Sequence, residues 1–114
     1  MGLKFYNLDG KVIFSDYELN LKQLTAKFED ANEKHVPVVE IKGNEVNVKV
    51  GSNPHPMTEE HQIEYILLET DKGFYVKDLE ISSPACATFT IAKDEKVLRT
   101  YSYCNLHGLY VYEN

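Results

Sequence analysis

The 114-residue sequence has little cysteine and arginine, and it contains no long run of hydrophobic residues. Two cysteines cannot form a disulfide framework, and a chain without about 20 consecutive apolar residues is not expected to span a membrane. The net charge of -6 and the single arginine, Arg99, argue against nucleic-acid binding, because phosphate contacts need clustered basic side chains. The N-terminus lacks the apolar stretch of a secretory signal, so we expect a cytoplasmic location.

Short segments of β character, separated by turn residues, make up most of the chain. Seven such segments follow one another: Val36–Lys42, Glu45–Val50, Ile63–Glu69, Phe74–Leu79, Ala87–Ile91, Val97–Tyr103 and Leu109–Tyr112. Seven strands of this length predict an all-β fold, a seven-stranded immunoglobulin-like antiparallel β-sandwich. An open barrel is the competing architecture.

The N-terminal part, residues 1–32, is interpreted as a small lobe that precedes the sandwich domain, residues 33–114. Asp9-Gly10 is a dipeptide that favours tight hairpins. It lies between two short strand candidates, Leu3–Asn7 and Lys11–Ser15. The next stretch, Leu19–Phe28, has hydrophobic residues at helical spacing but no clear cap, so both helix and extended chain remain open.

All four histidines and one cysteine lie at predicted strand ends or in loops, where a rigid sandwich presents functional groups. They are His35, His55, His61, Cys104 and His107. Any one loop histidine is usually only solvated, but this grouping makes a metal site the better interpretation. Prolines on both sides restrict the backbone around His55, and a helical turn over Met57–Glu60 is expected to bring His61 toward it. Cys86 lies among small apolar residues, and we expect it to be an inert packing thiol.

Imidazole and thiolate ligands favour iron, copper, zinc or nickel over calcium and magnesium, which prefer oxygen. One cysteine with four histidines is a poor match for a closed structural zinc site. A blue-copper site would need a weak axial methionine, and none follows His107. Four imidazoles and one thiolate make five ligands and leave one position open for a small molecule. A cupredoxin-like electron-transfer protein and a non-catalytic metal-binding domain remain alternatives.

Three segments closely resemble the motifs of the superoxide reductases, the desulfoferrodoxin and neelaredoxin family. These are Glu33–Pro37, Gly51–His61 and Cys104–Gly108, in the family's order and spacing, and they contain every histidine. The resemblance implies one mononuclear non-haem iron, ferrous when active, with Cys104 as its axial thiolate. The implied equatorial ligands are His35, His55, His61 and His107.

The resemblance also implies the activity, which is reduction of superoxide to hydrogen peroxide with electrons from an external donor such as rubredoxin. The family's Glu-Lys pair corresponds to Glu33 and Lys34. In the family the lysine attracts superoxide and helps order the water that protonates the product, while the glutamate can occupy the open metal position after oxidation. Steering by Lys34 matters here because the net charge of -6 repels an anion. We further expect a homo-oligomer, a dimer or a tetramer.

Two departures from the family pattern stand out. Many members hold a second iron on four cysteines in an N-terminal lobe, but residues 1–32 contain no cysteine, so that centre cannot form. The lobe is therefore expected to serve packing or dimerisation. The family usually has tryptophan two residues after the last motif's glycine, and this chain has Tyr110, which keeps an aromatic body and adds a hydroxyl group.

Overall fold

The structure is a computed structural model of the chain, and it describes residues 3–9, 11–26, 36–51 and 55–114. These residues form ten strands in three antiparallel sheets and no helix. The strands are β1 (Lys4–Leu8), β2 (Lys11–Ser15), β3 (Lys22–Leu24), β4 (Pro37–Lys42), β5 (Glu45–Val50), β6 (Ile63–Thr70), β7 (Phe74–Asp78), β8 (Cys86–Thr90), β9 (Val97–Cys104) and β10 (Gly108–Glu113). Within the described ranges, no helix could cross a membrane.

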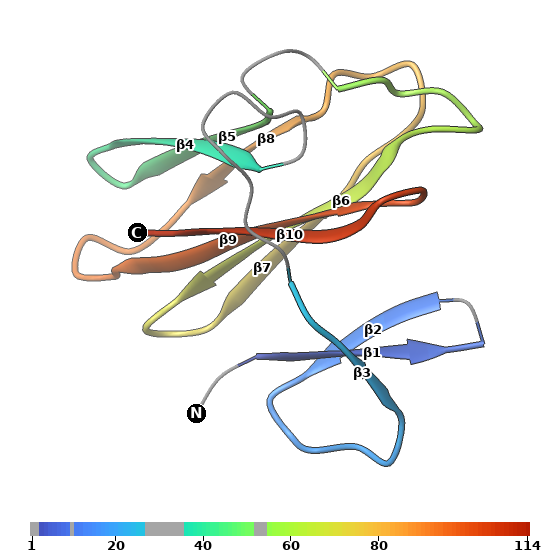
Figure 1. The fold of residues 1–114 in the computed structure, drawn as a ribbon. Coiled ribbons are helices and arrows are strands. Elements are labelled where there is room, and N and C mark those ends of the chain that lie inside the picture. Colours follow the sequence, from blue (N-terminus) through green and yellow to red (C-terminus); the bar gives the residue numbers. More distant parts are fainter. Residues whose placement is uncertain (1–2, 10, 27–35, 52–54) are drawn as a thin grey trace.

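The strands β4 to β10 build two sheets that face each other (Figure 1). One sheet has the order β4-β5-β8, and the other has the order β10-β9-β6-β7. This is an immunoglobulin-like arrangement in which β7 pairs with β6 instead of joining the first sheet. The predicted sandwich is confirmed for the described residues. The open barrel is wrong, because these strands pair within two separate sheets.

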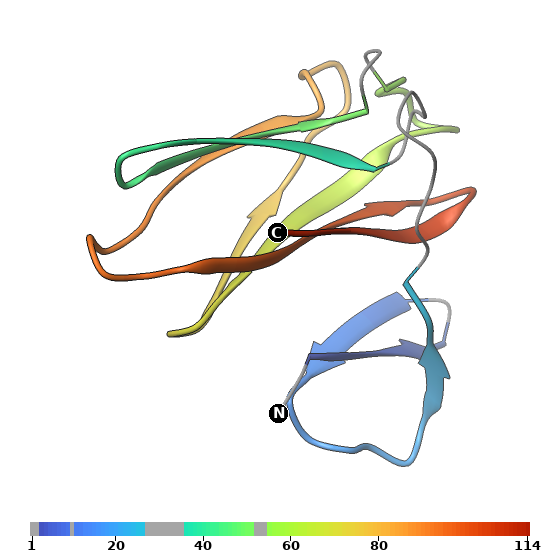
Figure 2. The same cartoon turned by 60° about the vertical axis from the view of Figure 1, so that its left-hand side comes forward.

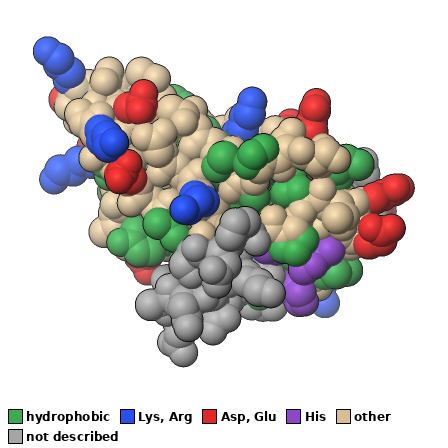
Figure 3. All heavy atoms as spheres, turned by 90° about the horizontal axis from the view of Figure 1, so that it is seen from above, with side chains coloured by type: hydrophobic (Ala, Val, Ile, Leu, Met, Phe, Trp, Pro, Cys, Tyr) green, Lys and Arg blue, Asp and Glu red, His purple; other side chains and the backbone are tan. Residues whose placement is uncertain are grey.

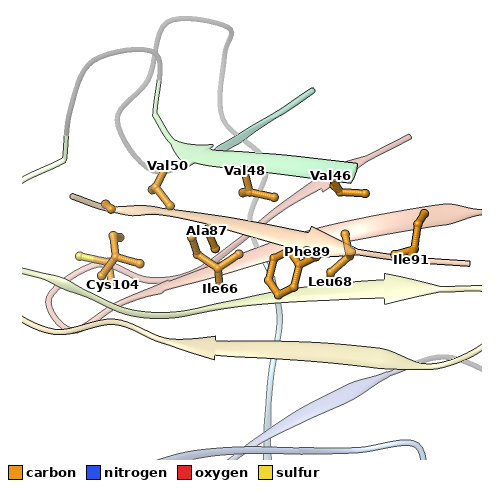
Figure 4. Packing of buried hydrophobic residues seen from close by; sticks show 11 residues of the cluster. Val46, Val48, Val50, Ile66, Leu68, Ala87, Phe89, Ile91 and Cys104 are labelled. Carbon is orange, nitrogen blue, oxygen red and sulfur yellow. The ribbon is translucent and has the colours of Figure 1, made fainter. Parts of the chain in front are cut away.

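The core between the two sheets follows from the alternation of apolar residues along the strands. On β5, Val46, Val48 and Val50 are buried, and the residues between them are exposed or half-buried. They form one cluster with Ile66 and Leu68 of β6, and Figure 4 shows the valine side chains directed toward the opposite sheet. Alternation alone therefore determines which face of β5 is inside.

The N-terminal sheet, with the order β2-β1-β3, lies against the outer face of the β10-β9-β6-β7 sheet (Figure 2). Phe5 of β1 belongs to one buried cluster with Leu67 of β6, Tyr101 of β9 and Val111 of β10. Because β6 is covered on both faces, all of its residues from Ile66 to Thr70 are buried. The N-terminal sheet thus packs on the strands that end at the histidine-bearing loops.

Two local expectations can be compared with the structure here. In the ambiguous stretch 19–28, the described residues form the short strand β3, so the extended alternative holds for Lys22–Leu24. Cys86 is not a packing thiol, because it is exposed at the start of β8. The alternation of β8 directs Ala87 and Phe89 into the core and leaves Cys86 on the outer side.

Candidate metal centre

Cys104 is the last residue of β9 and is completely buried. It pairs with Gly108 at the start of β10, so the chain reverses over only three residues. Gly108 has a φ of 95°, a left-handed conformation that glycine adopts without steric strain. This tight hairpin returns His107 to the sulfur, and its Nδ1 lies 3.7 Å from the Cys104 Sγ.

Two further histidines reach the same end of the sandwich from the loop before β6. The ring of His61 lies 4.7 Å from that of His55 and 5.1 Å from that of His107, measured between centroids. Donor atoms of His55, His61 and Cys104 all lie within 4.8 Å of one another. Figure 3 shows the histidine side chains together on one face of the molecule. Residues distant in the sequence therefore converge at one place.

A backbone contact of His55 indicates which ring nitrogen carries a proton. The side chain is 5% exposed, and its Nδ1 lies 2.7 Å from the carbonyl oxygen of Pro56. Because a carbonyl oxygen can only accept, Nδ1 must carry the proton and donate it. A proton on Nδ1 leaves Nε2 as the nitrogen that would bind a metal, which is the usual arrangement of a metal-binding histidine.

The loop before His61 has a different shape from the one predicted. Residues Met57–Glu60 form no helical turn, although His61 does approach His55 as expected. Thr58 closes this loop instead: its backbone N–H donates to the His61 carbonyl oxygen at 2.9 Å, and its Oγ1 accepts from the His61 N–H at 3.1 Å. The hydroxyl replaces the helical hydrogen bond, which sequence periodicity alone did not reveal.

The remaining predicted residues, Glu33, Lys34 and His35, lie outside the described residues. The chain immediately after them can be located. The carbonyl oxygen of Val36 accepts a hydrogen bond from the N–H of Gly51 at 3.0 Å. The segment that follows His35 therefore runs beside the start of the loop that leads to His55.

The surroundings of the four described donors are apolar on the inside and acidic outside. Cys104 belongs to the main hydrophobic cluster and lies at one end of the row in Figure 4. Glu59 and Glu60, just before His61, are both exposed.

Tyr65 and Tyr103 stack on the other face of the sheet, with their ring centroids 5.7 Å apart. Burial raises the pKa of each hydroxyl above its ordinary value. Both phenols are therefore protonated at neutral pH.

This donor set fits a transition metal. The ligand atoms are one buried sulfur and imidazole nitrogens, a combination that iron, zinc and copper accept and that calcium and magnesium do not. Cys104 is a free thiol rather than half of a disulfide. The sequence predicted these residues as donors, and the structure brings His55, His61, Cys104 and His107 together. The sequence did not predict the contacts of Pro56 and Thr58.

Comparisons with known proteins show which sequences and structures this chain resembles. The family model described as Desulfoferrodoxin matches residues 27–113. A desulfoferrodoxin homolog from Archaeoglobus fulgidus is 45% identical over 82 residues, which cover 72% of this chain and 64% of that protein. The match thus spans less than two thirds of that relative's length.

Two solved structures are also similar. A superoxide reductase from Treponema pallidum is 35% identical, with a TM-score of 0.87 and coverage of 98% of both chains. A superoxide reductase from Giardia intestinalis is 31% identical, with a TM-score of 0.62 and coverage of 72% of this chain and 97% of its own. The first of these likenesses therefore includes the N-terminal sheet as well as the sandwich.

Proposed function

This chain belongs to the desulfoferrodoxin family, and on that premise we propose that it is a superoxide reductase. The reaction adds one electron and two protons to superoxide and yields one hydrogen peroxide. The observation that carries the proposal is the convergence of His55, His61, His107 and the buried Cys104 at one end of the sandwich. Structures named superoxide reductase share the fold that produces this convergence.

We assign the metal as one iron, which His35, His55, His61, His107 and the Cys104 sulfur would hold. Bound iron would supply one-electron redox chemistry, with electrons from an external donor protein such as rubredoxin. The burial of Cys104 keeps the sulfur away from water and from oxidants. Imidazole ligands carry no charge and would not cancel the positive charge of a bound iron. This positive charge would attract an anionic substrate.

Lys34 and Glu33 complete the proposed site. Lys34 supplies a local positive field for superoxide, and its role gains weight from the exposed Glu59 and Glu60, which repel anions near His61. Distant acidic residues matter less, because physiological salt screens charges over about 8 Å. Lys34 would also help order the water that protonates the product, and Glu33 would supply a carboxylate ligand to the oxidised metal.

The two parts of the chain are proposed to have separate roles. Residues 33–114 are proposed to form the catalytic domain. Residues 1–32 are proposed to form a lobe whose described strands pack on the sandwich, and without cysteine this lobe cannot hold a second iron on four cysteines. We expect the protein to act in the cytoplasm as a homo-oligomer, a dimer or a tetramer.

Metal analysis and an absorption spectrum of the oxidised protein test the centre first. We expect one iron per chain and a charge-transfer band from thiolate to ferric iron. The exposed Cys86 offers a matched control, because Cys86→Ser should keep this band. Zinc or copper in place of iron, without any reaction with superoxide, would reject the proposal in favour of a cupredoxin-like or non-catalytic metal protein.

The yield of hydrogen peroxide tests the reaction itself. A reductase produces one peroxide for each superoxide consumed, whereas dismutation produces half as much. The measurement needs a reduced donor in excess, with the consumption of donor followed in parallel. A ratio of one half with no net donor oxidation would identify a dismutase and overturn the assignment as a reductase.

A further inference from the structure

Asn105 connects two loops that carry donor atoms of the candidate metal centre. Its side-chain Oδ1 accepts from the N–H of Gln62 at 2.9 Å, and its Nδ2 donates to the carbonyl oxygen of Glu60 at 3.0 Å. Its backbone N–H donates to the carbonyl oxygen of Gln62 at 3.1 Å. One residue thus binds the backbone on both sides of His61, and its partner Gln62 is 43 residues away in the sequence.

The place of Asn105 in the chain makes these contacts specific to the site. It directly follows Cys104 and belongs to the tight turn that returns His107 to the sulfur. Its carboxamide therefore joins the backbone that holds the sulfur to the backbone that holds the His61 imidazole. A change in this contact changes the spacing of two proposed ligands at once.

The pairing of β6 with β9 brings the two loops together, but it does not by itself fix the spacing of His61 and Cys104. The pairing of β6 with β9 has a register shift between Ile63 and Tyr65, directly beside the pair formed by Ile63 and Cys104. Thr58 closes the His61 loop on itself, but its hydrogen bonds run within that loop and give it shape without relating it to Cys104. The contacts of Asn105 supply that relation.

We propose that Asn105 is a positioning residue, which sets the distance and orientation of the His61 imidazole relative to the Cys104 sulfur. The inference rests on the proposed metal centre. Metal sites tolerate ligand distances only within about 0.2 Å of their preferred values, so a loop that is free to shift weakens binding and alters the ligand field. Loss of outer contacts of this kind typically costs about 10- to 100-fold in metal affinity.

The two side-chain hydrogen bonds are not equivalent. The bond to the Gln62 N–H is partly buried, so water replaces it poorly when the carboxamide is removed. The bond to Glu60 is exposed, and water can take its place. The acceptor oxygen of Asn105 therefore contributes more than its amide group.

Asn105→Ala tests the inference with cobalt(II) as the metal probe. This substitution removes both side-chain bonds and leaves the backbone bond to Gln62 in place. Asn47→Ala is the matched control, because Asn47 also makes two side-chain hydrogen bonds, one of them to Thr88 of the neighbouring strand β8. Titration against a competing chelator gives the affinity, and the thiolate-to-cobalt absorption band reports the geometry. Thermal unfolding of the metal-free proteins reports general stability.

We expect Asn105→Ala to bind cobalt(II) about 10- to 100-fold more weakly, with a shifted thiolate band. Asn47→Ala should match the parent in cobalt affinity and in the position of the thiolate band. Both metal-free variants should lose some stability, and Asn105→Ala should lose more because one of its hydrogen bonds is partly buried. Parent affinity together with an unshifted band in Asn105→Ala would overturn the inference. If the parent itself binds no cobalt through a thiolate, the proposed metal centre fails instead, and the inference falls with it.

A second variant covers the case in which Asn105→Ala does not fold. Asn105→Asp has the same shape and keeps the acceptor for the Gln62 N–H, while it loses the donor to Glu60. If both variants fold, the thiolate band of Asn105→Asp should lie between the bands of the parent and of Asn105→Ala. If only Asn105→Asp folds, its band should lie close to that of the parent. If Asn105→Asp shows no thiolate-to-cobalt band, although it keeps the acceptor oxygen, the proposed role of that oxygen is wrong.

Discussion

Replacement of Phe5 by alanine should destabilise the whole protein, although Phe5 lies in the N-terminal sheet. Its side chain is 3% exposed and packs against Tyr101 of β9, with ring centroids 4.8 Å apart. An aromatic side chain buries about 150–250 Å², which at about 25 cal/mol per Å² corresponds to roughly 4–6 kcal/mol as an upper bound. Replacement of a buried phenylalanine by alanine in other proteins typically lowers the free energy of unfolding by about 3–5 kcal/mol.

Urea unfolding of the metal-free protein measures this loss without a contribution from ligand binding. A free-energy loss of about 4 kcal/mol lowers the midpoint by about 2 M, given a slope of roughly 2 kcal/mol per M. Phe14 is the matched control, because it lies opposite Phe5 in the β1-β2 register but is 37% exposed. Phe14→Ala leaves no enclosed cavity and should cost roughly 1–2 kcal/mol.

The comparison tests whether the N-terminal sheet and the sandwich unfold as one unit. If they do, Phe5→Ala shifts a single transition, and fluorescence and circular dichroism report the same midpoint. The reasoning is refuted if the main transition keeps its midpoint while a small separate transition moves. The same holds if Phe14→Ala costs as much as Phe5→Ala, because burial would then not explain the loss.

Three further predictions concern the site and the opposite end of the sandwich. Lys34→Ala should slow superoxide consumption severalfold and flatten its salt dependence, and an unchanged second-order rate constant would exclude the steering role. Cys104→Ser should abolish the thiolate charge-transfer band of the iron protein and lower the rate, so a variant that keeps iron and the parent rate contradicts an electronic role for the sulfur. A hydrogen bond from Thr70 is the largest of the interactions that hold the pKa of Glu95 below its ordinary value of 4.5. A pKa lowered in the folded state stabilises the fold above about pH 4.5, and this stabilisation is lost as the pH falls through the folded-state pKa. Glu95→Gln should therefore unfold more easily than the parent at pH 7, with a difference that narrows below pH 4.5, and a difference that is constant with pH would contradict this linkage.

The sequence by itself determined the local structure of the sandwich. The strand predicted at Glu45–Val50 is β5, and the alternation of Val46, Val48 and Val50 with polar residues accounts for its buried face. Gly43 lies between two predicted strands, and its φ of 60° fits the tight hairpin between β4 and β5. The spacing of Cys104 and His107 likewise placed both groups in one loop. These features depend on neighbours within a few positions, so a local pattern is sufficient to predict them.

Other features depended on contacts between distant segments. No local pattern distinguished the exposed side of Cys86 from the buried side of Ala87, because both are small and apolar. The Thr58 loop was predicted as a helical turn, because hydrogen bonds from a side chain to the backbone leave no periodic signal. The packing of Phe5 on the sandwich was also beyond the sequence pattern, which marked a hydrophobic residue but not the surface that covers it.

For the candidate metal centre, the sequence determined which donor atoms are present, and the tertiary structure decided which of them meet. His61 and Cys104 approach each other because β6 pairs with β9, and Asn105 joins their loops. Such pairing is a cooperative result of packing the whole sheet, so the residues near either ligand do not determine it by themselves. The types of the individual residues therefore determine which donor atoms the site has, while the folded sandwich determines how they are arranged.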